Sequence, residues 1–253
     1  MNPLDPSPAK PTVKPTAALQ ARSLSKRFGD QIAVDCLDLS VFPGEILCLL
    51  GANGAGKTTT IQLFLGFLTP TAGAAMVNGQ AVADDVVAAR RRVAYIPENV
   101  RLYPHLSGVE NLSFFTCLAG RPTPSRSELI AWLADAGLQA DAADRRVEAY
   151  SKGMRQKVGI AMALAKAAEA LLLDEPMSGL DPAAASSFCD LLRQLRDRGV
   201  GVLMTTHSLF RAHDVGDRIG IMKRGSLVAL EATADLDLAG LERLYLDRSG
   251  VDS

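Results

Sequence analysis

The glycine-rich segment from Gly51 to Thr58, with the sequence GANGAGKT, is the feature that most limits how this chain can fold. It matches the pattern G-x-x-x-x-G-K-[ST] at every fixed position. The apolar run Glu45 to Leu50 before it is predicted to be a buried strand. Lys57 to Leu68 after it is predicted to be a helix, ended by Thr69-Pro70. This order of strand, loop and helix predicts an α/β fold with a phosphate-binding loop.

The chemistry of phosphate binding explains the spacing of this motif. Glycines allow backbone N–H groups to curl around phosphate oxygens, where a Cβ would obstruct them. The helix that begins near Lys57 adds the positive end of its dipole. Lys57 can reach the β- and γ-phosphates, and the Thr58 hydroxyl can coordinate Mg²⁺. The residues predicted to bind the nucleotide here are Gly51, Ala52, Asn53, Gly54, Ala55, Gly56, Lys57, Thr58 and Thr59.

Two acids and a histidine complete the candidate catalytic group. Asp174 and Glu175 directly follow the apolar run Leu171 to Leu173. Asp174 is predicted to hold Mg²⁺, and Glu175 to polarise the attacking water. His207 follows a predicted strand over residues 200–206 and is expected at the same sheet edge, where it can contact the γ-phosphate. We predict Lys57, Glu175 and His207 to be catalytic.

The rest of the chain divides into regions of different character. Residues 1–18 hold five of the thirteen prolines and are predicted to be a disordered tail. Asn78-Gly79 predicts a tight hairpin. Helical patterns dominate residues 97–168, where Ser125 and Glu128 form a possible capping box. Further strands are expected at residues 170–173, 200–206, 219–222 and 227–230, with a helix over residues 182–198.

Composition excludes several classes of protein. Hydrophobic residues at 48% and charged residues at 22% exclude wholesale disorder. A net charge of −1 excludes the broad basic surface of a dedicated nucleic-acid binder, so no nucleic-acid partner is expected. The apolar stretch from Val158 to Leu173 is interrupted by charges and is shorter than the ~20 residues of a membrane span, which predicts a soluble protein. The four cysteines are predicted to be small core residues, and they are Cys36, Cys48, Cys117 and Cys189.

The segment Tyr150 to Gln156, with the sequence YSKGMRQ, resembles the signature motif of ATP-binding-cassette (ABC) ATPases. The other motifs follow in that family's order and are similar to its Walker A (51–58), Walker B (171–175), D-loop (178–181) and switch histidine (206–207). The resemblance covers about residues 19–230 and is strongest to the nucleotide-binding subunits of ABC-2-type transporters. It implies a P-loop NTPase core with a mixed β-sheet, an antiparallel β subdomain and an inserted helical subdomain.

The resemblance also implies roles that spacing alone does not supply. Ser151 and Gly153 would contact the γ-phosphate held by another subunit, and Asp181 would connect the two sites. Phe28 would stack on adenine, although a place in the core is the alternative. Glu98 stands where the family usually has Gln. Its carboxylate can accept a hydrogen bond from water or coordinate Mg²⁺ but cannot donate as an amide does.

A second departure from the family pattern lies within the signature motif itself. Lys152 replaces a glycine and would add positive charge near the partner's phosphates.

The function implied by the resemblance is an ATPase that binds ATP and Mg²⁺. Two chains, either copies or homologous subunits, would close on MgATP and drive movement of a substrate, with export the commoner direction. The work would pass through the segment Asn99–Leu118 to ABC-2-type permease subunits, with the ATPase on the cytoplasmic side of the membrane. The expected domains are an ATP-binding domain at 19–232, a helical subdomain at about 97–168 and a helical extension at 233–253, which would pack or stabilise the dimer.

Three other functions stay open at this point. An ABC ATPase of similar size could serve an assembly machine, such as iron–sulfur assembly, without a transporter. A GTP switch is a second class, but the chain lacks an N-K-x-D segment that reads guanine. A dimerisation module without chemistry is the third, and the joint presence of Lys57, Asp174, Glu175 and His207 argues against it.

Overall fold

Two β-sheets form the framework of the chain in the computed structural model, which describes residues 16–249. The larger sheet has the strand order β10-β9-β3-β8-β7-β6, and the smaller has the order β2-β1-β4-β5. The strands are β1 (Leu19–Phe28), β2 (Gln31–Val41), β3 (Ile46–Leu50), β4 (Ala72–Val77), β5 (Gln80–Ala81), β6 (Val93–Ile96), β7 (Ala170–Asp174), β8 (Gly201–Thr206), β9 (Arg218–Lys223) and β10 (Ser226–Ala232). Most of the predicted tail, residues 1–18, lies outside the described residues.

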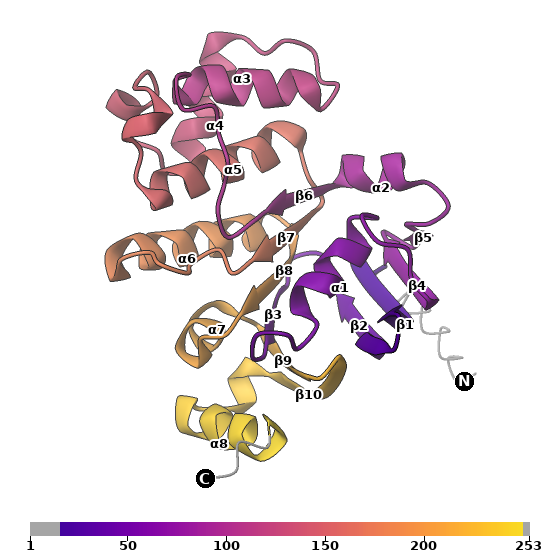
Figure 1. Cartoon of the computed structure of the whole chain (residues 1–253). Coiled ribbons are helices and arrows are strands. Elements are labelled where there is room, and N and C mark those ends of the chain that lie inside the picture. Colours follow the sequence, from indigo (N-terminus) through magenta and orange to yellow (C-terminus); the bar gives the residue numbers. More distant parts are fainter. Residues whose placement is uncertain (1–15, 250–253) are drawn as a thin grey trace, which may run out of the picture.

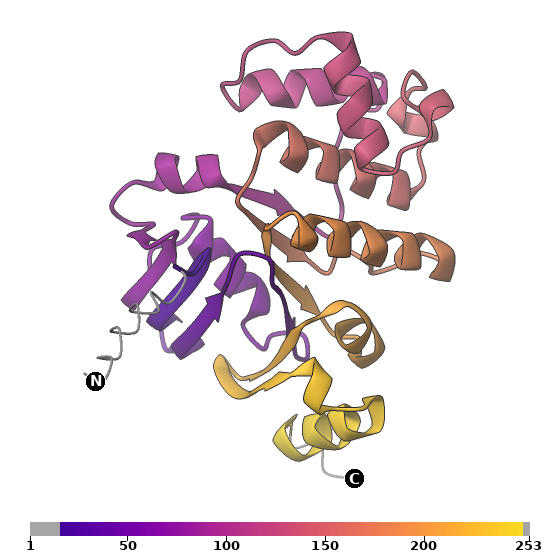
Figure 2. The ribbon, with the colours of Figure 1, turned by 180° about the vertical axis from the view of Figure 1, so that it is seen from behind.

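Helices cover the larger sheet and form a separate group at one end (Figures 1 and 2). They are α1 (Lys57–Phe64), α2 (Val86–Arg92), α3 (Gly108–Leu118), α4 (Arg126–Asp135), α5 (Lys152–Lys166), α6 (Pro182–Asp197), α7 (Leu209–Val215) and α8 (Leu238–Ser249). The group α3, α4 and α5 falls between β6 and β7 in the chain, where a mainly helical region was predicted. The predicted fold class, a mixed sheet with an antiparallel β part and inserted helices, is confirmed.

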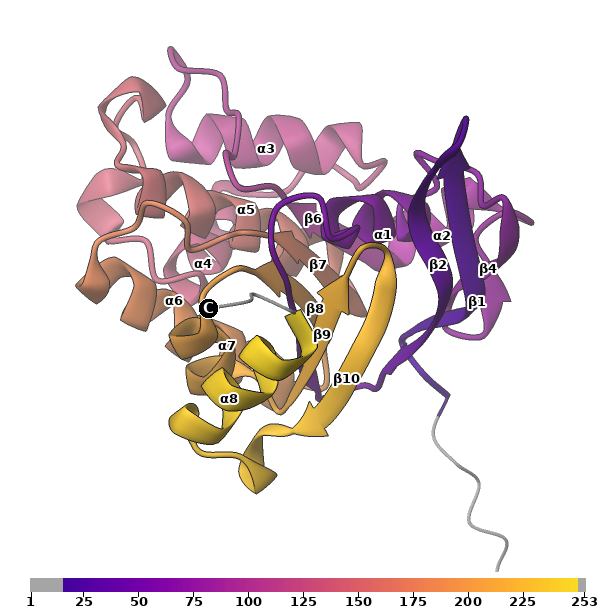
Figure 3. The same cartoon turned by 60° about the horizontal axis from the view of Figure 1, so that its bottom comes forward.

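The central parallel strands β3, β7 and β8 are buried on both faces, which explains why they are apolar without alternation. In β3, Cys48 and Leu50 belong to the core beneath α5, α6 and α7. Leu47 and Leu49 face the other core, which includes α1 and the antiparallel sheet. Figure 3 shows this smaller sheet lying beside α1, well apart from α8. The two cores together hold the phosphate-binding loop between the sheets.

The order of the parallel strands brings distant motifs to one edge. β8 lies between β3 and β7, with Leu50 paired to Thr206 and Asp174 paired to Thr205. β6 continues the row beside β7. The carboxyl ends of parallel strands meet at the same edge, which is where open α/β sheets bind ligands. The loops after β3, β6, β7 and β8 therefore share one site.

Most local signals in the sequence describe the structure correctly. Asn78 and Gly79 both have positive φ and join β4 to β5, as the hairpin signal predicted. The capping box of Ser125 and Glu128 begins α4, and hydrogen bonds from Ser125 lower the pKa of Glu128. The capping box of Ser107 at the start of α3 is equivalent and was not predicted.

Helix α1 is shorter than predicted. It ends at Phe64 instead of Leu68. Gly66 then adopts a φ of +62°, and a Cβ at this position would lie 2.8 Å from Val86 Cγ1. The N–H groups of Gly66 and Phe67 donate to the carbonyl oxygens of Leu63 (3.1 Å) and Gln62 (2.9 Å), which is a Schellman C-cap. The glycine therefore ends the helix, and the prediction that Thr69-Pro70 ends it is wrong.

The prediction that all four cysteines are core residues is wrong for two of them. Cys48 and Cys189 are buried, and burial raises the pKa of the Cys189 thiol to about 11. Cys36 and Cys117 are exposed. Cys36 lies in an edge strand, β2, whose outward positions face solvent, and it adopts a φ of +43°. An apolar sequence context therefore did not report burial at these two positions.

The C-terminal helix α8 packs against α7 and β9. Leu241 is fully buried and joins the core on that side of the larger sheet. Within residues 16–249, no helix is long and apolar enough to cross a membrane.

We expect Leu241→Ala to lower the free energy of unfolding by about 2–5 kcal/mol, because it leaves a cavity beneath α8. Leu238→Ala is the matched control, since this leucine is 40% exposed on the same helix. Its effect should be within about 1 kcal/mol. Urea denaturation of both variants measures the difference. Equal, small effects would show that α8 does not contribute to the core.

Candidate functional site

The phosphate-binding loop is shaped by two glycines that no other residue can replace. Gly56 has a φ of +105°, and a Cβ there would lie 2.4 Å from the carbonyl oxygen of Ala33. A Cβ on Gly51 would lie 2.6 Å from the carbonyl oxygen of Met222. The loop therefore fits tightly against β2 and β9, and α1 begins directly after Gly56. This is a cradle of backbone N–H groups at a helix N-terminus, which suits a phosphate.

Lys57 is buried within this loop although it carries a charge. Its Nζ donates hydrogen bonds to the carbonyl oxygens of Gly51 (2.6 Å) and Ala52 (3.2 Å). It also lies 3.6 Å from Glu175 Oε1. A buried ammonium needs such partners, and phosphate oxygens can replace them when a triphosphate occupies the loop.

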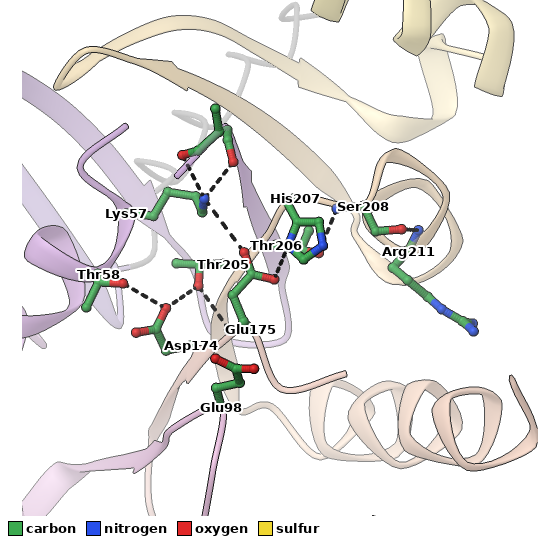
Figure 4. A network of polar contacts seen from close by, with 12 residues as sticks. Lys57, Thr58, Glu98, Asp174, Glu175, Thr205, Thr206, His207, Ser208 and Arg211 are labelled. Carbon is green, nitrogen blue, oxygen red and sulfur yellow. Dashed lines mark hydrogen bonds and ion pairs between the residues drawn. The ribbon is translucent and has the colours of Figure 1, made fainter. Parts of the chain in front are cut away.

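A hydroxyl and a carboxylate suited to Mg²⁺ meet at the start of α1. Thr58 Oγ1 donates to Asp174 Oδ1 at 3.2 Å, and the buried Thr205 Oγ1 donates to the same oxygen at 2.6 Å (Figure 4). Mg²⁺ prefers oxygen ligands and usually combines one or two carboxylates with phosphate oxygens and waters. Thr58 and Asp174 fit that pattern. In the described part of the chain, no group of three His, Cys, Asp or Glu side chains is arranged to hold a metal by itself.

Glu175 is held between Lys57, His207 and a strand (Figure 4). Its Oε2 lies 3.0 Å from His207 Nδ1. Its Oε1 is buried without a hydrogen-bond partner among the described residues, because Lys57 Nζ is slightly too distant at 3.6 Å. The backbone of Glu175 adopts a φ of +47°, and its N–H donates to Thr205 Oγ1 at 3.1 Å. A strained residue with a free carboxylate oxygen can accept a proton from a water.

A cavity of about 370 Å³ opens beside this group. It is lined by Phe28, Gln31, Ala33, Ala52, Asn53, Gly54, Ala55, Gly56, Lys57, Thr58, Thr59 and Glu175. Phe28 is 46% exposed, and Lys26 Nζ lies 5.1 Å from the centre of its ring. The alternative that Phe28 is a core residue is therefore wrong. Its ring lies where a nucleobase can stack.

The signature residues do not line this cavity. Ser151 is the N-cap of α5, and its Oγ accepts a hydrogen bond from Met154 N at 3.3 Å. Asp181 is the N-cap of α6 and accepts from Ala184 N at 2.8 Å.

Glu98 is also absent from the cavity lining. It is exposed and forms an ion pair with Lys152 at 3.5 Å. Hydrogen bonds and ion pairs thus join Asp174 and His207 to the cavity residues Lys57, Thr58 and Glu175, whereas Ser151, Gly153, Asp181 and Glu98 do not line the cavity.

Two residues at this site were missed in the sequence. Thr205 connects Asp174 to the backbone of Glu175, and the available signal was a hydroxyl in a buried strand just before His207. Gln156 is fully buried in α5 and donates to the carbonyl oxygen of Glu98 at 2.9 Å. No signal in the sequence predicted that contact.

Comparison with known proteins gives a consistent result. Residues 34–178 match the family model described as ABC transporter. The chain is 36% identical to Nod factor export ATP-binding protein I of Cupriavidus metallidurans, over 85% of this chain and 71% of the relative. It is 37% identical to the daunorubicin/doxorubicin resistance ATP-binding protein DrrA of Streptomyces peucetius, over 88% and 68%.

Solved structures agree with these relatives. The ATP-binding subunit of an ABC transporter is similar with a TM-score of 0.79 and 32% identity, over 91% of this chain and 98% of that one. A dimeric, post-hydrolysis ATP-binding cassette, MJ0796 bound to ADP and phosphate, is similar with a TM-score of 0.74 and 25% identity, over 85% and 98%.

We expect Thr205→Val to lower the turnover of nucleotide about 10- to 100-fold, because it removes a hydrogen bond to a charged group. Thr205→Ser keeps the hydroxyl and should retain most activity. Steady-state kinetics with a Mg²⁺ titration measures the change, and nucleotide binding should be little affected. Equal activity of the two variants would contradict a role for this hydroxyl in positioning Asp174.

Proposed function

Because this chain belongs to the ABC transporter family, as one of its ATPase subunits, we propose that it powers an exporter of the ABC-2 type. In this proposal two ATPase subunits close on MgATP, and separate permease subunits move the substrate. The observation that carries it is the convergence of Lys57, Thr58, Asp174, Glu175 and His207 at one sheet edge. Phosphoryl transfer requires mainly positioning and neutralisation of charge, and these side chains supply both.

We propose the following roles for the residues of the site. The loop 51–59 holds the triphosphate, with Lys57 on its β- and γ-phosphates. Mg²⁺, held by Thr58 and Asp174, would neutralise charge on the phosphates. Glu175 accepts the proton of the attacking water, and His207 holds the Glu175 carboxylate in place through the 3.0 Å contact. Phe28 stacks on the adenine.

The second half of each site would come from another subunit. Ser151 and Gly153 begin α5, whose N-terminus is a second anion-binding end, yet neither residue lines the cavity of its own chain. Asp181 would connect the two sites across the interface. The dimeric cassette among the similar structures supports this arrangement. The partner is a second copy of this chain or a homologous ATPase subunit.

An exposed aromatic surface supports docking to a permease. Tyr103, which precedes α3, and Phe114 on α3 are 50% and 41% exposed, with ring centres 5.0 Å apart. Leu118, at the end of α3, is 70% exposed. Phe115 stacks beside them and lines a cavity of about 170 Å³ between β6, α3 and α5. Exposed apolar patches of this kind mark interaction sites. A cytoplasmic segment of the permease would cover this patch and place the ATPase at the cytoplasmic face of the membrane.

The names of the relatives support export as the direction of transport. Two of them are an export ATP-binding protein and a drug resistance ATP-binding protein. A third is the linearmycin resistance ATP-binding protein LnrL of Bacillus subtilis, 32% identical over 92% of this chain and 76% of the relative. Export is the direction that these names support, and the ABC-2-type permease is proposed from the resemblance of the sequence motifs.

We expect Glu175→Gln to bind MgATP normally but to lower turnover at least about 100-fold, because the amide cannot accept the proton of water. It should also accumulate as an ATP-loaded dimer in size-exclusion chromatography with light scattering. Lys57→Ala should instead weaken nucleotide binding about 10- to 100-fold. Normal turnover by Glu175→Gln would contradict the role assigned to Glu175. If GTP competes for the nucleotide site as effectively as ATP does, a GTP switch is favoured instead.

We expect Leu118→Glu to reduce co-purification with a polytopic membrane protein, because a charge within the aromatic patch must lose its hydration on docking. Phe210→Glu is the matched control, since Phe210 is 57% exposed on α7, outside the patch. Circular dichroism checks that both variants fold. Failure of the unchanged chain to retain any membrane protein would instead favour a soluble assembly ATPase.

A further inference from the structure

The first residue of α5 is a lysine, which the helix dipole disfavours. Lys152 directly follows the cap Ser151, at the positive end of the helix. Its ammonium is paired with Glu98, with Nζ and Oε1 3.5 Å apart. The two side chains are 29% and 47% exposed. Pairs this open to solvent contribute little to stability, so stability of the fold does not explain why the pair is present.

Helix α5 holds the backbone near Glu98 independently of this ion pair. Gln156, one turn after Lys152, donates to the carbonyl oxygens of Pro97 (3.3 Å) and Glu98 (2.9 Å). Gly159, a further turn on, packs against Ile96, because a Cβ there would lie 3.5 Å from Ile96 Cγ2. The backbone after β6 is thus attached to α5 by buried contacts. The Glu98 side chain can therefore change partner without displacing that backbone.

The Lys152 ammonium also lies at the junction with a third segment. Its Nζ is 3.8 Å from the position that a Cβ would take on Gly179, in the loop that follows Glu175. A Cβ on the next residue, Gly153, would lie 3.8 Å from Leu180 Cδ2 and 3.4 Å from Ala184 Cβ, so this residue packs against the same segment. Lys152 therefore lies among the loops that, in the proposed dimer, meet the triphosphate bound by the other subunit.

We propose that Lys152 exchanges one anion for another when the dimer closes. Before closure it pairs with Glu98 of its own chain. On closure it turns to the triphosphate held by the other subunit, whose negative charge exceeds that of one carboxylate, and Glu98 is released. Glu98 thus competes with nucleotide for Lys152 and restrains closure. This inference rests on the proposed function, since it requires the MgATP-dependent dimer.

The proposal predicts opposite effects for the two members of one ion pair. In a Glu175→Gln background with MgATP, Glu98→Gln should tighten the dimer about 2- to 5-fold, because Lys152 is then free. Lys152→Met should weaken the dimer about tenfold, because a charged contact to phosphate is lost. Adding Glu98→Gln to Lys152→Met should change nothing further. Sedimentation velocity over a range of protein concentrations measures the dissociation constants.

Control variants separate this exchange from a merely structural effect. Arg126 and Asp144 form another exposed ion pair in the helical region, and Arg126→Met or Asp144→Asn should leave the dimer constant within about twofold. Lys152→Arg keeps the charge and should stay close to the parent. Thermal unfolding of each variant without nucleotide checks that it folds.

Each outcome of this experiment has one meaning. Shifts in the same direction for Glu98→Gln and Lys152→Met, or an effect of Glu98→Gln that persists without Lys152, would overturn the exchange. If the Glu175→Gln parent forms no dimer with MgATP, the proposed dimer itself fails. That result is distinct, because it appears before either residue of the ion pair is changed.

Discussion

The parallel pairing of β3, β8, β7 and β6 is the constraint on which the rest of this structure depends. Each strand ends at the same edge, so each loop that follows it contributes to one site. Inserting β8 between β3 and β7 places Thr205 against Asp174 and carries His207 to Glu175. A different strand order would leave every motif intact and separate the residues that act together.

Charge within the site is balanced by groups of the chain itself. Lys57 is buried and is satisfied by two carbonyl oxygens of its own loop, while Glu175 lies between Lys57 and His207. A buried charge without partners would be strongly unfavourable. The contacts are replaceable, because phosphate oxygens can take the place of the loop carbonyls.

Several residues serve the fold and the proposed chemistry together. Ser151 and Asp181 are N-caps of α5 and α6. Both helices begin at loops that belong to the proposed interface between subunits. The connection between β6 and α3 is likewise attached to α5 by Gln156.

The sequence by itself determined the motifs, the α/β class, the family and most elements. The residue types and spacings of GANGAGKT and of Leu171 to Glu175 need particular backbone conformations that are local to each motif. Helix caps and the Asn78-Gly79 turn are local for the same reason.

Only the tertiary structure decided what depends on contacts between distant segments. Cys36 and Cys117 are exposed because of where their elements lie. The hydrogen bond from Thr205 to Asp174 and the pairing of Glu98 with Lys152 join residues 31 and 54 positions apart, and no local pattern reports such a contact.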